Sequence, residues 1–402
     1  MKSTKLYNIG QLASFNSTKK EMICMKNVEI ILEKNKIVEV GRNLNDADNI
    51  FNCKGMLVTP GFIDPHTHPV FLNSRNDELM MRLNGDTYEN INKKGGGITK
   101  SISDVRESTK VELIKKVKNR MDQFLKLGTT TIECKSGYGL NKESELKSLE
   151  IIENVNKNHE IDMIPTFMGA HAIPPEYKSN PDSYVEVICN DIIPAIKKQG
   201  IAIFNDVFCE KGYFNEEQSI KILNCGKNHG LIPRLHADEF ENSNGAKVAY
   251  ETDAISADHL MAVSDEGLNF LKKSNTIATL LPGTTFFLGK NTYAPYDKIR
   301  EMGIEVALAT DFNPGSCYIK SIPFIMSLAC LYLNMPILET LKSVTYVSAK
   351  SLRLENKVGS IEKNMVADIL IWNVESLEKI VTKIPNPIIY QIIKNGKFLI
   401  KS

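Results

Sequence analysis

The feature that most constrains the fold is a pattern that repeats eight times between about residue 57 and residue 350. In each repeat a short β-branched or apolar run ends in polar residues, and a helix-compatible segment follows most of these runs. Strands that alternate with helices are typical of parallel βα units, and eight such units predict a closed (β/α)8 barrel. The predicted strands are residues 57–63, 129–133, 161–166, 203–208, 231–235, 253–257, 276–280 and 306–310.

Helical segments are predicted at residues 104–127, 142–158, 181–198 and 216–228. Residues 92–103, which include three consecutive glycines, are predicted to form a flexible loop after the first barrel strand.

The two ends of the chain have a different pattern. Residues 28–32 and 36–40 are predicted to form a hairpin. Near the C-terminus, Asn395-Gly396 between the apolar runs 389–393 and 398–400 is a strong signal for a second hairpin. We therefore predict that residues 1–56 and 355–402 form one small β-sandwich domain assembled from both termini, and that residues 57–354 form the catalytic barrel.

Composition narrows the class of protein. The chain has 402 residues, 42% of them apolar and 24% charged, with a formal charge of +1. This balance gives no reason to expect nucleic acid or an anionic membrane surface as a partner. No apolar run reaches the roughly 18 residues that span a bilayer, and no apolar segment follows the first five residues as in a secretory signal. Eight scattered cysteines without a Cys-x-x-Cys pair suit a reducing cytoplasm.

His66 and His68 follow an apolar segment and are two residues apart. In an extended strand such residues point to the same side, so both rings could bind one metal ion. Taken alone, such a pair is more often two solvated histidines in a loop than a metal site.

Further polar residues gather at the carboxyl ends of the predicted strands, where the active sites of such barrels form. Five of the seven histidines occupy these ends, and His159 and His229 fall at the opposite rim, where we expect them to face solvent. The residues at the strand ends are His66 and His68 after the first strand, His171 after the third, His236 after the fifth, His259 after the sixth and Asp311 after the eighth.

His66, His68, His236 and Asp311 make a plausible ligand set for one metal ion. Nitrogen and carboxylate ligands suit Zn(II) or Fe(II) and leave a position for water. Such a metal lowers the pKa of bound water from about 15.7 to roughly 7. Glu239 and His259 are candidates for moving a proton or polarising a carbonyl. The alternatives are a carboxylate that stabilises a helix N-terminus for Glu239 and a buried, backbone-bonded histidine for His259.

Arg75, Tyr138 and His171 are candidate substrate contacts, since arginine can hold a carboxylate through two parallel hydrogen bonds. A surface salt bridge for Arg75 and simple packing for Tyr138 are the competing interpretations. The segment Asn313-Pro314-Gly315-Ser316 is compatible with a plain turn, but it directly follows Asp311.

Together these residues resemble the amidohydrolase superfamily, and longer phrases resemble its imidazolonepropionase family in order along almost the whole chain. The phrases lie at residues 135–140, 169–177, 206–210, 235–240, 256–260 and 309–316. The resemblance implies hydrolysis of 4-imidazolone-5-propanoate to N-formimidoyl-L-glutamate, the third step of histidine degradation. It also implies a cytoplasmic homodimer that uses zinc or iron.

Carried over residue by residue, the resemblance assigns the metal to His66, His68, His236 and Asp311. In the implied reaction Asp311 accepts a proton from the attacking water, His259 stabilises the oxyanion, and Glu239 orients the ring or shuttles a proton. The implied substrate contacts are Arg75, Tyr138, His171, Glu239, Asn313, Gly315 and Ser316, with Tyr88 as a further candidate.

Lys135 leaves one ambiguity, because binuclear amidohydrolases bridge two metals with a carbamylated lysine at a strand end. Its Ser-Gly-Tyr-Gly context resembles the mononuclear family, so we expect one metal per chain. Two other functions stay open: a deaminase acting on an aromatic base with the same metal set, and a non-catalytic barrel that serves as a scaffold. The second would be expected to have lost ligands, and this sequence retains all of them.

Overall fold

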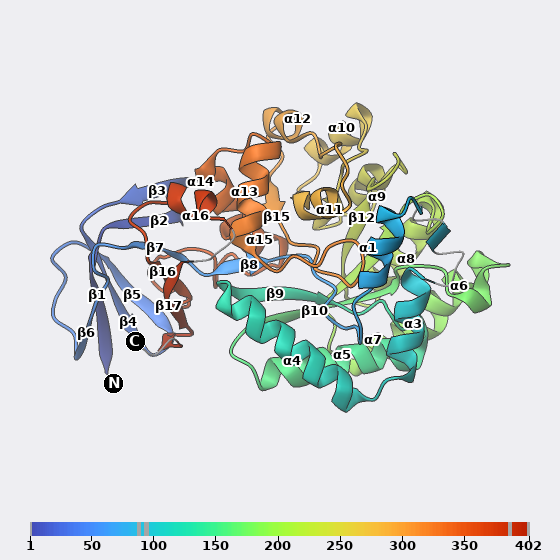
Figure 1. Ribbon diagram of the computed structural model, residues 1–402, viewed down its shortest axis with the longest axis horizontal. Coiled ribbons are helices and arrows are strands. Elements are labelled where there is room, and N and C mark those ends of the chain that lie inside the picture. Colours follow the sequence, from blue (N-terminus) through green and yellow to red (C-terminus); the bar gives the residue numbers. More distant parts are fainter. Residues whose placement is uncertain (1, 87–89, 92–95, 385–387, 400–402) are drawn as a thin grey trace.

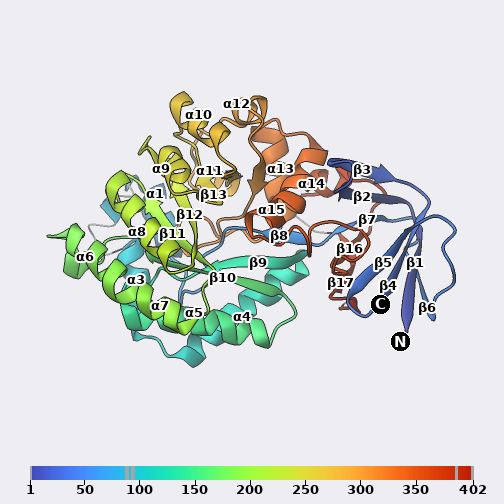
Figure 2. The same ribbon diagram turned by 180° about the vertical axis from the view of Figure 1, so that it is seen from behind.

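The largest sheet of the protein, in a computed structural model that describes residues 2–86, 90–91, 96–384 and 388–399, is an eight-stranded parallel barrel (Figures 1 and 2). Each strand pairs with the next one along the chain, which confirms the predicted (β/α)8 architecture. The strands are β8 (Phe62–Asp64), β9 (Thr129–Lys135), β10 (Asp162–Ala170), β11 (Phe204–Cys209), β12 (Ile232–Ala237), β13 (Ser256–His259), β14 (Ile277–Leu280) and β15 (Val306–Leu308).

The gap between the first and last barrel strands is bridged just beyond their carboxyl ends. Thr67 and Phe312 form an isolated parallel bridge. The backbone N–H of His68 donates to the carbonyl of Phe312 at 2.8 Å, and that of Asp311 donates to the carbonyl of His66 at 3.2 Å. These bonds hold the His66–His68 segment beside Asp311, although about 245 residues separate them in the sequence.

Helices surround the barrel and bury apolar stripes against it. In α4 (Lys110–Lys126), a capping box between Thr109 and Glu112 starts the helix, and residues at helical spacing, from Leu113 to Phe124, are fully buried. The other barrel helices are α5 (Lys142–Lys157), α6 (Pro181–Val187), α7 (Ile193–Gln199), α8 (Glu216–Asn228), α9 (Gly245–Glu251), α10 (Asp265–Lys273), α11 (Pro282–Phe287), α12 (Tyr296–Glu301), α13 (Ile322–Tyr332), α14 (Ile337–Ser343) and α15 (Tyr346–Ser351).

The first βα connection differs from the sequence prediction. Residues 98–103, predicted as loop, belong to helix α3 (Ile98–Glu107), and the predicted helix 104–127 is divided at Ser108 and Thr109. The buried side chains of Ile102 and Val105 explain α3, because they pack into the main core. A further helix, α1 (Asn76–Leu83), precedes it. Residues 92–95 of the predicted loop lie outside the described residues.

The predicted first strand is also divided. Residues 57–60 form β7 (Leu57–Pro60), which pairs with β16 (Ile369–Trp372) in another sheet, and only β8 belongs to the barrel. Gly61 separates the two strands, and a Cβ atom there would lie 2.3 Å from Thr130 Oγ1. The close approach of the Thr130 side chain to the backbone of Gly61 therefore requires glycine.

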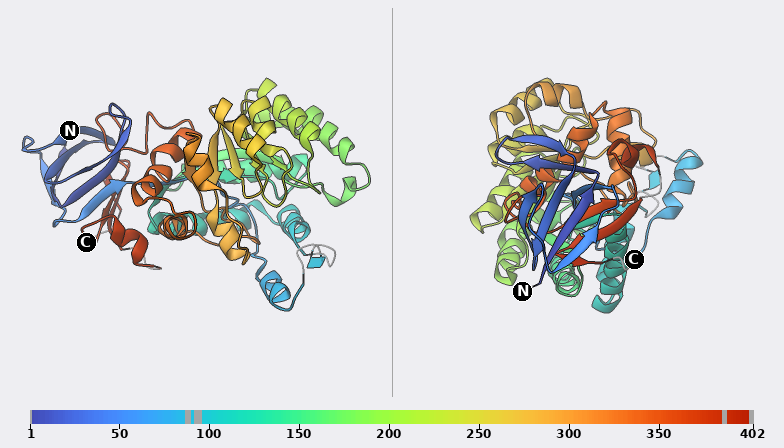
Figure 3. Two further views of the ribbon diagram at one scale, coloured as in Figure 1. Left: turned by 90° about the horizontal axis from the view of Figure 1, so that it is seen from above. Right: turned by 90° about the vertical axis from the view of Figure 1, so that its left-hand side faces the viewer.

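Two further sheets pack together at one end of the barrel, where both termini lie (Figure 3). Leu6 and Ile30 of one sheet and Val58, Ile371 and Ile393 of the other share one buried core. One sheet contains β5 (Lys36–Gly41), β4 (Val28–Glu33), β1 (Ser3–Ile9) and β6 (Asn49–Asn52), and the other contains β18 (Lys397–Phe398), β17 (Ile389–Lys394), β16, β7, β2 (Gln11–Asn16) and β3 (Glu21–Met25).

Both hairpins predicted from the sequence are present in these sheets. The strands β4 and β5 pair antiparallel, and so do β17 and β18. Asn395 and Gly396 both have positive φ, as a type I′ turn requires. After β16 the chain forms a short helix, α16 (Glu378–Thr382). Within the described ranges, no helix is both long and apolar enough to cross a membrane.

Candidate metal centre and active site

Four predicted ligands converge at the carboxyl ends of the barrel strands. His68 Nε2 lies 3.3 Å from His66 Nε2 and 3.2 Å from His236 Nε2. Asp311 Oδ1 lies 3.5 Å from His66 Nε2 and 3.6 Å from His68 Nε2. Donors about 2.0–2.2 Å from a tetrahedral metal ion stand about 3.3–3.6 Å apart. These spacings are of the size that a divalent metal ion requires, and the described residues hold two candidate groups of three that share His66: one is His66, His68 and Asp311, and the other is His66, His236 and His259.

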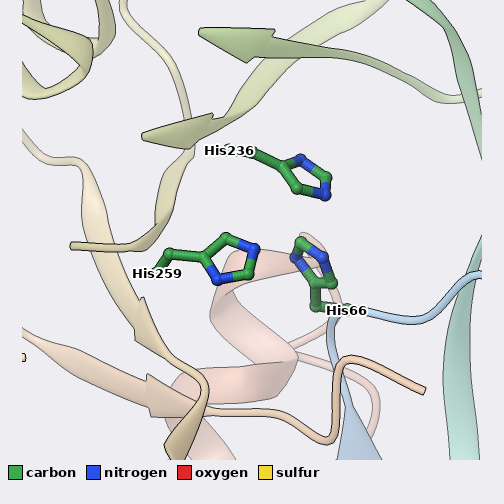
Figure 4. Close-up of side chains that lie close together, drawn as sticks. All are labelled: His66, His236 and His259. Atoms are coloured by element: carbon green, nitrogen blue, oxygen red, sulfur yellow. The ribbon is translucent and has the colours of Figure 1, made fainter. Parts of the chain in front are cut away.

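His259 lies beside the same cluster (Figure 4). One nitrogen of His259 lies within 4.8 Å of ligand atoms of His66 and His236. Neither of its ring nitrogens has a hydrogen-bond partner among the described residues, although the side chain is buried. Buried polar atoms of a protein normally have partners, so this ring faces the chemistry of the site rather than the backbone.

The burial of these rings favours their neutral forms. It is the main cause that lowers the pKa of His66, His68 and His259 well below the usual value, and neighbouring positive groups add to it. Neutral imidazole is the form that binds metal. The backbones of His259 and Asp311 are held at φ 83° and 53°. Non-glycine residues rarely adopt this left-handed region outside constrained sites.

A second layer of carboxylates fixes the orientation of two rings. His66 Nδ1 lies 2.6 Å from Asp258 Oδ2, and His236 Nδ1 lies 2.9 Å from Asp206 Oδ1. An ionised carboxylate only accepts, so each Nδ1 carries the proton and each Nε2 presents its lone pair to the cluster. Thr284 Oγ1 donates to Asp311 Oδ2 at 2.5 Å, which leaves Oδ1 facing the histidines.

Lys135 forms two buried ion pairs below the cluster of candidate ligands. It lies on β9, the second barrel strand, with a side chain that is 0% exposed. Its Nζ donates to Glu133 Oε1 at 2.9 Å and to Asp206 Oδ2 at 2.7 Å. These contacts favour a charged ammonium over a carbamate that bridges two metals, because a carbamate would place like charges together.

A cavity of about 600 Å³ opens above the cluster and contains almost all of the predicted site residues. His66 and Gly315 do not line it, and the cationic side chains of Arg82, Lys211 and Lys290, which the sequence analysis does not single out, do. The predicted residues that line it are His68, Arg75, Tyr138, His171, His236, Glu239, His259, Asp311, Asn313 and Ser316.

Arg75 is a buried residue and not a surface cation. Its Nε lies 3.0 Å from Glu78 Oε1, and its Nη1 donates to Ser101 Oγ at 3.2 Å. Glu78 Oε1 also accepts from the backbone N–H of Gly97 at 2.7 Å. Helices α1 and α3 thus present the guanidinium to the cavity in one orientation.

Tyr138 and His171 stand side by side in the cavity wall, with ring centroids 5.1 Å apart. His171 Nδ1 donates to the Gly137 carbonyl at 2.9 Å, so its Nε2 is left as an acceptor. Burial, together with nearby His236, lowers the pKa of His171 to about 3, and the ring is neutral. The predicted contact Tyr88 lies outside the described residues.

Glu239 and Asn313 have different surroundings. Burial and then the charge of Asp311 raise the pKa of Glu239 well above its usual value, and Glu239 Oε2 lies 3.6 Å from His259 Nε2. The side chain of Asn313 stabilises the turn that begins at this residue. Its Oδ1 accepts hydrogen bonds from the backbone N–H groups of Gly315 and Ser316 at 2.9 and 2.7 Å. The plain-turn interpretation thus describes the side chain of Asn313, although the residue also lines the cavity.

Sequence reasoning missed the residues that support the ligands. Asp206, Asp258 and Arg234 are 0% exposed. The sequence signal is a charged residue inside a run that is otherwise apolar or β-branched, and Arg234 in addition lies two residues before the candidate ligand His236. The prediction for His159 is wrong, since its side chain is 5% exposed and its Nε2 lies 3.1 Å from Asp122 Oδ1.

Comparison with known proteins agrees with this geometry. Residues 218–399 match the model of the amidohydrolase family. The fold resembles an atrazine chlorohydrolase variant of Arthrobacter aurescens TC1 solved with zinc and atraton, with a TM-score of 0.74, 15% identity and coverage of 99% of this chain and 95% of that one. It also resembles a zinc-bound adenosine deaminase of Xanthomonas campestris, with a TM-score of 0.70, 13% identity and coverage of 98% and 92%.

Fold and site together define a metal-dependent hydrolase of the amidohydrolase class. The imidazolonepropionase of Brevibacillus brevis is 43% identical over 389 residues, which cover 94% of this chain and 92% of that protein. That of Treponema denticola is 40% identical, over 92% and 91% of the two chains. The chain belongs to the imidazolonepropionase family.

Proposed function

We propose that this chain hydrolyses 4-imidazolone-5-propanoate to N-formimidoyl-L-glutamate, the third step of histidine degradation. Water adds to the ring carbonyl carbon, the adjacent ring C–N bond breaks, and a proton moves to the leaving nitrogen. The observation that carries the proposal is the buried His66, His68, His236 and Asp311 cluster at the floor of a cavity whose wall presents Arg75. Names of relatives that match nearly the full chain support the substrate.

We assign one metal ion per chain, Zn or Fe, to His66, His68, His236 and Asp311. When bound, a divalent metal supplies Lewis acidity that lowers the pKa of a coordinated water from about 15.7 to roughly 7. Three imidazoles and one carboxylate suit either metal, and availability decides between them. Two metals per chain in elemental analysis would contradict the assignment and favour a carbamylated Lys135.

Side chains of the protein carry out the proton transfer, stabilise the oxyanion and orient the substrate. Asp311 accepts a proton from the attacking water, while Thr284 donates a hydrogen bond to Asp311 Oδ2 and holds the carboxylate in place. The unpartnered ring of His259 stabilises the developing oxyanion of the tetrahedral intermediate. Burial and then the charge of Asp311 raise the pKa of Glu239 well above its usual value, which favours the protonated carboxyl, and in that form Glu239 can donate a hydrogen bond that orients the ring.

The propanoate carboxylate pairs with the buried guanidinium of Arg75. Tyr138 and His171 contact the ring from the cavity wall, and the turn from Asn313 to Ser316, including Gly315, closes around the propanoate. We further propose a cytoplasmic homodimer whose only other partner is its small-molecule substrate. We propose a division into a barrel within residues 57–354, from which β7 extends into a sheet of the small domain, and a small domain of residues 1–56 and 355–402.

A spectrophotometric assay of imidazolone propanoate loss with metal-reconstituted protein tests the activity. Deamination of cytosine or guanine by the same preparation, without loss of the imidazolone, would refute it. His259→Ala should lower kcat by about 10²- to 10⁴-fold while elemental analysis still finds one metal per chain. Loss of the metal from this variant would instead make His259 a ligand.

A further inference from the structure

We infer that Arg234 is a positioning residue for this reaction, because its buried guanidinium hydrogen-bonds one of the two carboxylates that orient the metal-binding rings of His66 and His236, and lies at ion-pair distance from the other. The inference rests on the proposed function, since it concerns how the chain prepares its metal site. It adds to that function a residue that touches neither substrate nor metal ligand.

The placement of Arg234 follows from strand register. It lies on β12, two residues before His236, so both side chains point to the same face of the sheet. Asp206 on β11 is its direct partner across one ladder, and Asp258 on β13 is the direct partner of His236 across the next. Three adjacent strands thus place a cation, two carboxylates and a ligand side by side in the barrel interior.

Arg234 fixes the position of His66 through two contacts. Its Nη2 donates to Asp258 Oδ2 at 3.2 Å, and the same oxygen lies 2.6 Å from His66 Nδ1. Nη2 also donates to the carbonyl of Pro65 at 2.7 Å. The guanidinium therefore fixes both the carboxylate that holds the ring and the backbone of the preceding residue.

Arg234 Nε lies 3.7 Å from Asp206 Oδ2, an ion-pair distance. The other oxygen of Asp206 holds His236 Nδ1 at 2.9 Å. Lys135 donates to Asp206 Oδ2 and to Glu133, and Glu133 Oε2 accepts from the backbone N–H of Thr67 at 3.1 Å. Both cations thus connect Asp206 to the segment that carries His66, by two separate routes.

The charges of this network are complementary to a divalent cation. When ionised, Glu133, Asp206, Asp258 and Asp311 carry four negative charges, against two positive charges on Lys135 and Arg234. The first three carboxylates and both cations have side chains that are 0% exposed. Removing one partner of such a network leaves an uncompensated buried charge, so a purely structural role also predicts lower stability. The test must measure something that stability alone does not change.

The experiment compares the metal-free wild type with Arg234→Met, Arg234→Lys and a matched control, Lys394→Met. Lys394 is likewise 0% exposed and paired with two carboxylates, Asp162 and Asp368, both at 2.7 Å, but at the far end of the barrel. Zn²⁺ affinity is measured by competition with a chromophoric chelator. Histidine ¹⁵N NMR of the Zn²⁺-loaded proteins reports the Nδ1–H protons of His66 and His236.

Arg234→Met should weaken Zn²⁺ binding about 10- to 100-fold, lower kcat more than it changes KM, and broaden or shift both Nδ1–H signals. Arg234→Lys keeps the positive charge but loses the planar guanidinium with its several donors. Its Zn²⁺ affinity should lie between that of Arg234→Met and that of wild type. Lys394→Met should lose thermal stability and bind Zn²⁺ within about twofold of wild type. A folded Arg234→Met with wild-type affinity and NMR signals would overturn the inference. If Arg234→Met does not fold, wild-type affinity in Arg234→Lys would overturn it.

Failure of the proposed function has a different signature. Wild-type protein that binds Zn²⁺ but leaves imidazolone propanoate intact would refute the function, whereas the effect of Arg234 on metal affinity would stand. Full activity with no effect of Arg234→Met on Zn²⁺ affinity would refute only the positioning role.

Discussion

A methyl group at Gly315 should displace Arg75 and weaken binding of the substrate carboxylate. A Cβ atom built on Gly315 would lie 1.7 Å from Arg75 Nη2 and 2.3 Å from its Cζ, whereas ordinary contacts begin at 3.4 Å. The guanidinium must therefore move by about 1.7 Å, the difference between these contact distances. Contacts with Glu78 and Ser101 oppose that movement.

Loss of one charge-assisted hydrogen bond costs about 1.5–3 kcal/mol, which corresponds to a fall in kcat/KM of about 10- to 150-fold. The effect should appear mainly in KM, because the propanoate is remote from the bond that breaks. Gly41→Ala is the matched control, since its Cβ would meet only the flexible end of Leu44, at 3.0 Å. The assay is steady-state loss of imidazolone propanoate.

A double-mutant cycle makes the reasoning refutable. If Gly315→Ala acts through Arg75, adding it to Arg75→Met should cause no further loss. An additive loss in the double variant, or an unchanged KM in Gly315→Ala, would show that the guanidinium does not hold the carboxylate in this position.

Three further predictions follow from the site and its surroundings. Dialysis against a chelator should abolish hydrolysis and lower the melting temperature, and one equivalent of Zn²⁺ or Fe²⁺ should restore both; activity in metal-free protein would contradict the assignment. Glu239→Gln, which keeps a hydrogen-bond donor, should retain more kcat than Glu239→Ala; equal losses would favour a proton shuttle. Burial, with neighbouring Arg120, lowers the pKa of Lys320 to about 8. Between about pH 8 and 10.5 the unfolded chain therefore binds more protons than the folded chain, and the free energy of unfolding should rise with pH across that range. Denaturant unfolding of Lys320→Met at several pH values should lack this rise.

The barrel, and the approach of its candidate ligands to one another, could be predicted because their signals are local. Each predicted strand is a short run rich in apolar or β-branched residues, and the candidate ligands lie at or just beyond its carboxyl end, as His236 does in β12 and Asp311 does after β15. The Asn395-Gly396 hairpin is likewise determined by two adjacent residues that accept positive φ. Such features need no knowledge of how distant strands align.

The supporting residues could not be predicted, because they depend on strand register and on packing. Asp206 meets Arg234, and His236 meets Asp258, only once β11, β12 and β13 are aligned. The division of the first predicted strand at Gly61 has a similar origin: the apolar run is continuous, and only the sheets that receive its two halves separate them. The first part of helix α3 lies in the predicted loop, because its buried stripe is short and follows a glycine run.

The supporting network also explains why the first histidine pair is informative only in its context. His66 and His68 bring two nitrogen atoms together wherever an extended segment carries them. They bind metal in a defined geometry only if the protein fixes which nitrogen carries the proton, and Asp258 does this for His66. Burying that carboxylate is unfavourable unless a cation compensates it, and Arg234 lies 3.2 Å away. Burying these charges costs free energy, and their mutual contacts hold the site in one geometry. A divalent cation, when bound, offsets part of that cost. Stability and catalysis should therefore decline together when the metal is removed.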